Sequence, residues 1–271
     1  MRHRHQSAAQ VYQLVLIAVS GLVLVSSCCG LHPVPEPLIS DPAEMSQRLQ
    51  GPPGDSAFFA EARVEYYGDG VARKGKMVLM AQAPDSLRIE LLSFTDDLLS
   101  VLVLEGGEFQ WFERGRKECL GGRLCAAPMV ARFPMVSTPD RLIQVFRGQV
   151  PLLPEPERKE LAFSREEGVY VLTLAQGNVE QQVRIAPDGK TVAGVRMLEG
   201  GRTAIDIELA GSLDVGGTTV PKRVRLKVPD DGLDLSVEFR EFVDGAPWKG
   251  DPFEFSCPKG TVYRALDCLE E

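Results

Sequence analysis

The sequence predicts a mainly β protein with antiparallel strands that follow an N-terminal export segment. Three observations lead to this prediction. Short runs along most of the chain alternate apolar and polar residues with the period of two that half-buried strands show. Turn pairs such as Gly-Gly and Asp-Gly separate these runs at hairpin intervals. The chain also opens with a basic and then apolar stretch that is typical of exported proteins.

The first 27 residues have the order of parts expected of a lipoprotein signal peptide. Two arginines and no acid precede an apolar run of roughly 15 residues, which is shorter than the about 20 that cross a bilayer. Val25-Ser26-Ser27-Cys28 then resembles a lipobox. We expect cleavage before Cys28, which would receive diacylglycerol and an acyl chain such as palmitate. The alternatives are an uncleaved anchor helix, an ordinary signal with an incidental cysteine, and lipidation at Cys29, which would put Ser26 at the branched position.

Residues 28–54 are expected to connect the anchor to the folded domain. Two or three acyl chains hold a protein durably on a membrane surface. Pro33, Pro35 and Pro37 favour an extended tether. A short helix should follow, capped by Asp41 and beginning at Pro42, and it should end before the Gly-Pro-Pro-Gly at 51–54. Residues 55–271 remain as one β-domain, because about 240 mature residues suit a single all-β unit.

Alternating runs and turn pairs divide the β-domain into about eleven strands joined as a meander. The clearest alternation occurs at 60–67, 87–91, 203–209, 223–228 and 233–240. The turn pairs between strands are Gly106-Gly107, Glu167-Gly168, Pro187-Asp188-Gly189, Gly200-Gly201, Gly216-Gly217 and Asp230-Asp231-Gly232. Hairpin spacing of this kind favours an antiparallel sheet over a parallel one.

Two runs, 77–81 and 98–104, are apolar at successive positions and should therefore be covered on both faces. The best candidate for the cover is a helix over 138–148, with Thr138 as its cap and Pro139 in its first turn. Its apolar stripe is Leu142, Ile143, Val145 and Phe146. An apolar, proline-rich loop follows at 150–156. The helix either completes the core or acts as a movable lid.

Charge and cysteine content exclude several classes of function. Removing residues 1–27 takes away two of the 30 basic residues and none of the 38 acidic ones, so the mature charge is near −10 and nucleic acid is not an expected partner. The four cysteines of the β-domain suggest two disulfides. Of the three connectivities, proximity in sequence favours Cys119–Cys125 and Cys257–Cys268. A zinc site is disfavoured because the domain has no close cysteine or histidine pair.

Three stretches resemble the LolA/LolB-like family of outer-membrane lipoproteins and periplasmic carriers. They are GKMVLMAQAPDSLRIELLSF (75–94), STPDRLIQVFRGQVPL (137–152) and FEFSCPKGTVYRAL (253–266), and their order and spacing extend the likeness over about 55–266. The resemblance implies a half-open antiparallel β-barrel of about eleven strands, closed by a short helical lid over an apolar cavity. This chain departs from the outer-membrane member in its four additional cysteines and in the loop at 150–156.

The resemblance implies that the cavity holds acyl chains of lipids or lipoproteins. The lid would be the stripe from Leu142 to Phe146, and the wall would include Met77, Leu79, Leu102 and Leu104, although a one-residue register shift would exchange the faces. The loop after the third strand carries a membrane-contacting apolar residue in the outer-membrane member. Phe94 matches it here and Leu98 is the poorer candidate. The simpler alternative is that Phe94 caps the core, and the adjacent Asp96 and Asp97 would resist an anionic surface.

We expect no enzyme activity, cofactor or metal. His3 and His5 leave with the signal and His32 lies in the tether, so the β-domain lacks histidine for a catalytic triad, a dyad or a histidine-ligated metal. Glycine-rich turns join strand to strand, so no helix N-terminus is available for phosphate. Glycosidase chemistry with paired carboxylates stays open, because acids are abundant on the polar faces of the strands.

Two hypotheses of function follow. The first is a lipid-binding lipoprotein, anchored in the outer membrane and facing the periplasm, that takes part in lipid or lipoprotein transport or in outer-membrane biogenesis. The absence of Asp after Cys28 favours the outer membrane, by resemblance to Lol-type sorting. The second is a non-catalytic structural or assembly lipoprotein with a filled barrel, whose surface docks an envelope protein.

Overall fold

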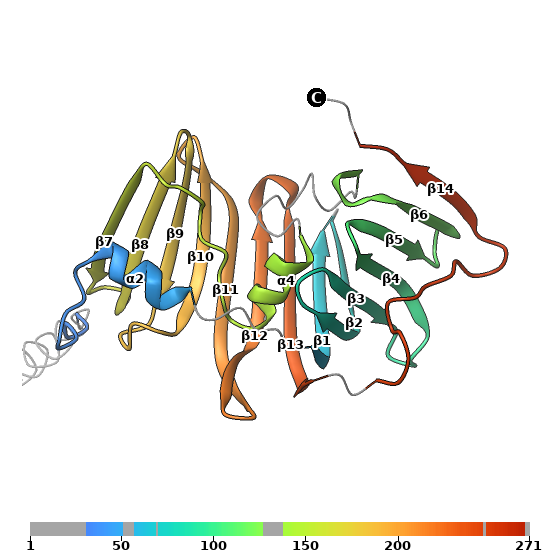
Figure 1. Ribbon diagram of the computed structural model, residues 1–271, viewed down its shortest axis with the longest axis horizontal. Helices are drawn as coiled ribbons and strands as arrows, with labels where there is room; N and C mark the ends of the chain where they lie inside the picture. Colours follow the sequence, from blue (N-terminus) through green and yellow to red (C-terminus); the bar gives the residue numbers. More distant parts are fainter. Residues whose placement is uncertain (1–30, 51–56, 69, 127–137, 246–247, 269–271) are drawn as a thin grey trace, which may run out of the picture.

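Fourteen strands form one open sheet in the computed structural model, which describes residues 31–50, 57–68, 70–126, 138–245 and 248–268 (Figure 1). The predicted signal peptide and Cys28 lie outside the described residues. The strand order is β14-β6-β5-β4-β3-β2-β1-β13-β12-β11-β10-β9-β8-β7. Two meanders, β1–β6 and β7–β13, therefore meet where β1 pairs with β13. Neither terminal strand of this order pairs with the other, so the sheet is not closed.

The described strands and helices have the following bounds. The first meander contains β1 (Phe58–Gly68), β2 (Val71–Gln82), β3 (Ser86–Leu92), β4 (Leu98–Glu105), β5 (Glu108–Glu113) and β6 (Glu118–Arg123). The second contains β7 (Arg158–Ser164), β8 (Val169–Gln176), β9 (Val179–Ile185), β10 (Val192–Glu199), β11 (Arg202–Val215), β12 (Thr218–Val228) and β13 (Leu233–Asp244). The remaining elements are β14 (Val262–Leu266), the helices α2 (Pro42–Leu49) and α4 (Pro139–Phe146), and the 3-10 turns η2 (Leu124–Ala126) and η4 (Pro229–Asp231).

The mainly β, antiparallel prediction is confirmed, but the sheet has more strands than the about eleven that alternation indicated. The additional strands are short and do not alternate cleanly. For example, β6 places three buried residues in succession, and β14 is exposed along most of its length. One pair also departs from the meander, because β14 lies parallel to β6, with Val262 opposite Glu118 and Leu266 opposite Gly122.

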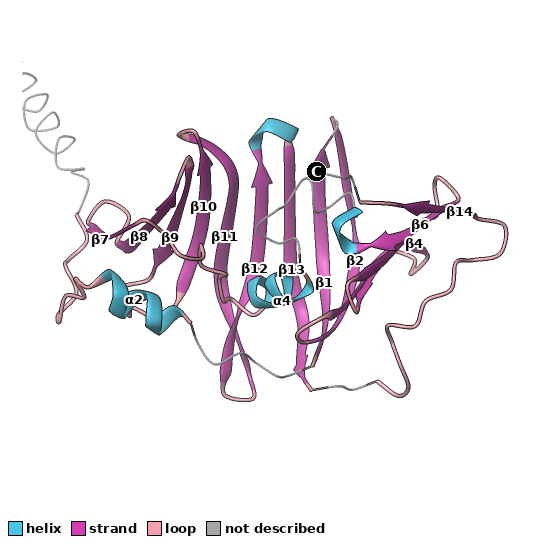
Figure 2. Ribbon diagram, turned by 45° about the horizontal axis from the view of Figure 1, so that its top comes forward, coloured by secondary structure: helices cyan, strands magenta, loops and turns pink. Residues whose placement is uncertain are grey.

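Both helices begin where the sequence predicts and lie on the same side of the sheet (Figures 1 and 2). The Asp41 side chain accepts a hydrogen bond from the Ala43 N–H at 2.8 Å and so caps α2. Thr138 occupies the cap position of α4, but its side chain makes no capping hydrogen bond. Helix α2 contacts β7 and β8, whereas α4 contacts β3 and β12. Because α4 touches a strand of each meander, the sheet curves around it and this side is its inner face.

The inner face holds the main hydrophobic core. Apolar residues from both meanders join the buried residues of α2 and α4 in one cluster. Aromatic rings bridge the seam between β1 and β13, where Phe58 stacks on Phe242 with ring centroids 4.7 Å apart. Phe146 of α4 meets Phe239 edge to face at 6.1 Å. Such pairs add about 0.5–1.5 kcal/mol beyond the area that they bury.

The two-sided apolar character of β4 is explained by two different covers. Leu102 and Leu104 face the inner cluster, whereas Val101 and Val103 face outward and are 0% and 4% exposed. We expected the helix at 138–148 to be the outer cover, and this prediction is wrong. The outer cover is the C-terminal strap, which we define as residues 248–268. Its Trp248, Phe253 and Phe255 pack over β4 together with Met80 and Leu98.

The disulfides connect different cysteines from those that proximity in sequence favoured. Cys119 is bonded to Cys257, and Cys125 is bonded to Cys268. The predicted Cys119–Cys125 bond is wrong because Cys119 lies in an extended strand. The four residue steps from Cys119 to the end of β6 already span roughly 13 Å, and cysteine Cα atoms must lie within about 7 Å to form a disulfide. The parallel β14–β6 pair instead brings the C-terminal strap alongside β6.

Candidate functional site

The residues predicted to form the lid and the wall all lie in one apolar cluster on the inner face. The register places Leu79 opposite Ile89 and Ile89 opposite Leu102, so these side chains share a face. Met77, Leu79 and Leu104 are at most 4% exposed, and Leu102 is half-buried. The eight predicted residues that meet there are Leu142, Ile143, Val145, Phe146, Met77, Leu79, Leu102 and Leu104.

Helix α4 is packed tightly onto the sheet. Ile143, Val145 and Phe146 are 2%, 5% and 8% exposed, so they fill much of the space that a cavity beneath the helix would need. Apolar residues on β3, β4 and β5 extend this surface beyond the helix and keep part of their area exposed. They are Ile89, Leu91, Leu102 and Trp111. The inner face thus combines a filled centre with a partly open apolar margin.

A recess of about 400 Å³ lies beside α4. Its wall is formed by the end of α2, the β2–β3 turn, one side of α4 and the loop after α4. The lining residues are Leu49, Gln50, Ala83, Pro84, Asp140, Arg141, Ile143, Gln144, Arg147, Gln149, Val150, Pro151 and Leu152. The Gln144 amide donates to the Asp140 carboxylate at 2.7 Å. The recess therefore has an apolar floor and a polar rim, a combination suited to an amphiphilic ligand.

Gln181 holds the loop after α4 against the sheet. Its side chain is 1% exposed, its amide donates to the Pro151 carbonyl at 2.8 Å, and its carbonyl accepts from the Leu153 N–H at 2.7 Å. These two bonds use backbone groups that a buried loop would otherwise leave unpaired. Gln181 was not among the predicted site residues. The signal was its position in the apolar phase of β9, between Val179 and Val183.

Arg147 follows α4 directly and lines one end of the recess. Its side chain is only 9% exposed, and its guanidinium pairs with Asp244 at 2.9 Å. The same guanidinium lies over the Phe58 ring, 5.2 Å from the ring centre. Arg147 thus links α4 to both seam strands, β1 and β13. No local pattern predicts this role, because an arginine after a helix is usually solvated.

The loop between β3 and β4 presents Phe94 to solvent, with 61% of its surface exposed. Hydrogen bonds fix the loop beneath it: Ser93 N–H donates to the Asp97 carbonyl at 2.8 Å, and Asp97 N–H donates to the Ser93 hydroxyl at 3.1 Å. Leu98, the alternative candidate, is half-buried against the outer cluster of β4. The exposure of Phe94 shows that it does not cap the core.

The two acids beside Phe94 are both paired with cations. Asp96 lies 2.6 Å from the Lys76 ammonium, and Asp97 lies 3.5 Å from the Arg114 guanidinium. A hydrogen bond from the Thr95 hydroxyl, and then the hydrogen bond and charge of Arg114, hold the pKa of Asp97 below its ordinary value. The two cations offset the repulsion that the acids would otherwise exert on an anionic surface.

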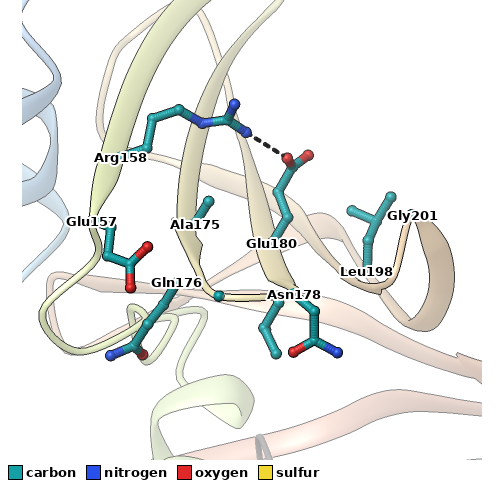
Figure 3. Close-up of a pocket in the computed structure, with 10 residues that line it drawn as sticks. Glu157, Arg158, Ala175, Gln176, Asn178, Glu180, Leu198 and Gly201 are labelled. Atoms are coloured by element: carbon teal, nitrogen blue, oxygen red, sulfur yellow. Dashed lines mark hydrogen bonds and ion pairs between the residues drawn. The ribbon is translucent and has the colours of Figure 1, made fainter.

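A second recess, of about 350 Å³, lies at the β8–β9 turn (Figure 3). Polar side chains surround it, including Glu157, Gln176 and Asn178, and Arg158 bridges to Glu180 at 2.9 Å. Its lining also includes the apolar residues Ala175, Val179 and Leu198.

Two kinds of feature are absent from the part of the chain that the structure describes. No group of three or more His, Cys, Asp or Glu side chains there is arranged to hold a metal ion. None of the helices described is long and apolar enough to cross a membrane.

Comparison with known proteins shows similarity in structure but not in sequence. No protein-family model and no curated protein sequence matches the chain. A DUF1329 family protein from Desulfovibrio piger has a TM-score of 0.52 at 10% identity, covering 79% of this chain and 94% of that one. A putative outer membrane lipoprotein-sorting protein domain from Vibrio parahaemolyticus has a TM-score of 0.50 at 10% identity, covering 78% and 93%.

A LolA superfamily protein from Nitrosomonas europaea is also similar, with a TM-score of 0.46 at 8% identity, covering 75% of this chain and 93% of that one. Identities this low establish the fold alone. The chain shares the fold of the Desulfovibrio piger and Vibrio parahaemolyticus neighbours. In the residues that the structure describes, this fold is one large open sheet with two short helices on its inner face.

Proposed function

We propose that this LolA/LolB-like chain is an envelope lipoprotein, anchored in the outer membrane through Cys28, that binds acyl chains of lipids or lipoproteins on its inner face. The observation that carries the proposal is the recess of about 400 Å³ beside α4, which adjoins the apolar cluster of the inner face. Its volume falls within the range of about 300–1,000 Å³ typical of small-molecule sites. The Vibrio parahaemolyticus neighbour is a putative outer membrane lipoprotein-sorting protein domain, which agrees with such a role.

Acyl chains would enter at the recess and extend under or beside α4. The recess already reaches Ile143, which belongs to both its lining and the main core. Because α4 is only eight residues long and draws its stability from packing, a competing acyl chain can displace part of it. The half-buried apolar margin on β3–β5 would then supply the rest of the contact surface. In this scheme, α4 acts as the lid.

Phe94 would deliver or collect cargo at a membrane or at a partner. Its fixed loop and its exposed ring provide a short apolar probe, and the ion pairs of Asp96 and Asp97 reduce the local charge. We propose no catalytic role for the chain. The β-domain contains no histidine. Among the residues that line the recess beside α4, Asp140 is the single carboxylate.

Native mass spectrometry of the mature chain with Cys28→Ser tests acyl-chain binding directly. Palmitate and a palmitoylated lipopeptide are the probes, and we expect each to add its mass to the protein. Gln149→Trp should fill the recess and weaken binding by about tenfold, equivalent to about 1.4 kcal/mol. The matched control is Gln176→Trp, which places the same side chain in the polar recess at the β8–β9 turn and should leave binding unchanged.

Three outcomes separate the alternatives. An apo mass that stays unchanged with both probes would contradict the carrier role and favour the structural or assembly lipoprotein. Equal weakening by both tryptophan variants would show that the recess beside α4 is not the site. Lipidation is tested separately by the mass of the N-terminal peptide from membranes, where Cys28→Ser should abolish both the lipid adduct and membrane attachment.

A further inference from the structure

The residues that follow the predicted lipidation site are docked on the folded domain from Leu31 onward. The His32 N–H donates to the Arg165 carbonyl in the β7–β8 turn at 2.8 Å. The Ile39 N–H donates to the Tyr170 hydroxyl of β8 at 3.2 Å, and Tyr170 is fully buried. The segment 31–39 is thus bonded to the domain at two points, although its prolines predicted an extended tether.

Two turn glycines make room for this docked segment. A Cβ atom at Gly168 would lie 2.7 Å from the His32 ring, and one at Gly189 would lie 2.5 Å from the Ile39 Cδ1 atom. Both glycines also have positive φ, at +68° and +65°, which side-chain-bearing residues rarely adopt. The segment therefore packs closely against both the β7–β8 turn and the β9–β10 turn.

The docked segment exposes three large apolar side chains. Leu31, Val34 and Leu38 are 54%, 41% and 51% exposed, although the segment that carries them is bonded to the domain through His32 and Ile39. Residues 31–38 contain one charged side chain, Glu36. Exposed apolar side chains on a segment that is bonded to the domain indicate a surface that contacts a membrane or another molecule when the protein functions.

The position of this surface in the chain identifies its cover. Leu31 lies three residues after Cys28, and three residues of chain reach at most about 11 Å. A bilayer that holds Cys28 must therefore come close to Leu31. We infer that Leu31, Val34 and Leu38 enter the same bilayer and orient the domain on it. This inference rests on the lipidation that the proposed function includes.

The lipid surface that suits this contact is neutral. Glu166 and Glu167 in the adjoining β7–β8 turn are exposed, as is Glu36, while Arg165, Lys190 and Arg48, which pairs with Glu44, are the nearby cations. The corner has no excess of positive charge, so anionic headgroups gain nothing there. Apolar insertion of the three side chains is the source of the contact.

This orientation would bring the recess near the bilayer. Helix α2 begins at Pro42, directly after the docked segment, and its eight residues span about 12 Å. Leu49, at its end, lines the recess beside α4. A lipid leaving the bilayer at this corner would therefore have a short path to the proposed site.

Phe94 would not share this contact. By register, the β3–β4 loop lies at the end of the strands that carries the β1–β2 hairpin, whereas the β7–β8 turn lies at the opposite end. Nine strand-to-strand steps, each about 4.8 Å, separate β3 from β7, which is about 43 Å along the sheet. The molecule would thus have one apolar contact at its anchor and a second, separate one at Phe94.

Photo-crosslinking of the lipidated chain tests the inference. A benzophenone amino acid replaces Leu31, Val34 or Leu38 in turn, and Val262 in a control, because Val262 on β14 is 67% exposed and remote from the segment. The protein is reconstituted in phosphatidylcholine vesicles, with and without phosphatidylglycerol. We expect phospholipid adducts at the three segment positions, at least fivefold above Val262, in both compositions. Adducts no more frequent than at Val262 would overturn the inference.

A second measurement follows orientation. Leu31→Ser/Val34→Ser/Leu38→Ser should leave the lipidated chain on vesicles but speed tryptic cleavage at Arg165 and Lys190 by at least fivefold. The control, Tyr67→Ser/Val71→Ser/Phe94→Ser, removes exposed apolar residues at the opposite end of the strands. It should not change this cleavage. The mass of the N-terminal peptide reports lipidation in every sample, so loss of the anchor is distinguished from loss of the segment contact. Unchanged cleavage in a lipidated triple variant would contradict the inference.

Discussion

The outer faces of the two meanders differ in what lies over them. On β4 of the first meander, Val101 and Val103 are buried, and the C-terminal strap covers them. On β9–β13 of the second meander the outer face is polar and uncovered. Its ion pairs join Arg225 to Asp234, Lys227 to Glu208, and both Arg184 and Arg196 to Asp206.

The difference shows how one sheet can be completed by unequal means. Burial of apolar area contributes about 25 cal/mol per Å², so the covered face adds stability but depends on the strap staying in place. Exposed ion pairs contribute about 0–1 kcal/mol each, so the two more exposed pairs, Arg225–Asp234 and Lys227–Glu208, add little and depend on no covering segment. We expect perturbations of the covered face to be large and cooperative, and those of the polar face to be small.

Removing the disulfides should have the largest effect, and the effect should not be additive. The two bonds close loops of 138 and 143 residues, each worth about 5 kcal/mol by chain entropy when it acts alone. Once one bond is present, the other closes only about 17 residues, worth about 3 kcal/mol. Each single Cys→Ser pair should therefore cost about 3 kcal/mol and the quadruple variant about 8 kcal/mol in denaturant unfolding. A quadruple cost equal to the sum of the pairs would contradict this scheme.

Shortening the Phe253 side chain of the strap should have the next largest effect. Phe253 is 4% exposed and meets Trp248 edge to face at 6.0 Å. Phe253→Ala should lower the free energy of unfolding by about 3 kcal/mol, because it leaves a cavity over β4. Phe253→Leu serves as the control and should cost less than about 1.5 kcal/mol. Equal costs for the two variants would show that the strap is not packed as a core.

Paired arginine substitutions compare the two faces directly. Arg88 donates to the Pro252 carbonyl of the strap at 2.8 Å and lies over the Phe255 ring at 5.6 Å, with 17% of its side chain exposed. Arg225 on the polar face is 42% exposed. Arg88→Met should cost about 1–3 kcal/mol, because it leaves buried polar groups without a partner, and Arg225→Met at most about 1 kcal/mol. Thermal unfolding of both variants decides whether the ranking holds.

Acid should produce the smallest effect, and it should come from the polar face. The Arg225 hydrogen bond lowers the pKa of Asp234, and the Lys227 hydrogen bond lowers the pKa of Glu208. The stability from these pairs is fully present above the ordinary carboxyl values, near 4, and is lost as the pH falls through the lowered values of the folded protein. Asp234→Asn/Glu208→Gln should flatten that part of the pH–stability curve slightly. A large change would mean that the pairs are more strongly coupled than their exposure indicates.

Local patterns predicted the helices and most of the second meander correctly. Asp41 and Pro42 marked α2, Thr138 and Pro139 marked α4, and the alternation from Leu233 began β13 where the structure does. These features depend on neighbouring residues, so they are visible in a short window of sequence.

The features that local patterns missed all depend on distant parts of the chain. The β14–β6 pair joins residues more than 130 positions apart, and with it came the disulfide connectivity. The same holds for the site, where Gln181 reaches the loop at Pro151 and Arg147 reaches Asp244. The apolar runs on β4 correctly required two covers, but nothing in the runs identified Phe253 as part of the second.

The seam between β1 and β13 has a consequence for how the protein is made. Strand β1 carries the buried side chains of Phe58, Ala60 and Val64. Its second hydrogen-bonding edge is paired only when residues up to Asp244, the end of β13, have been synthesised. At about 5–20 residues per second, that takes about 10–30 seconds. During this interval the first meander carries an unpaired, apolar edge of the kind that aggregates. Newly made chains therefore depend on being kept unfolded, or shielded, until the last third of the sequence arrives.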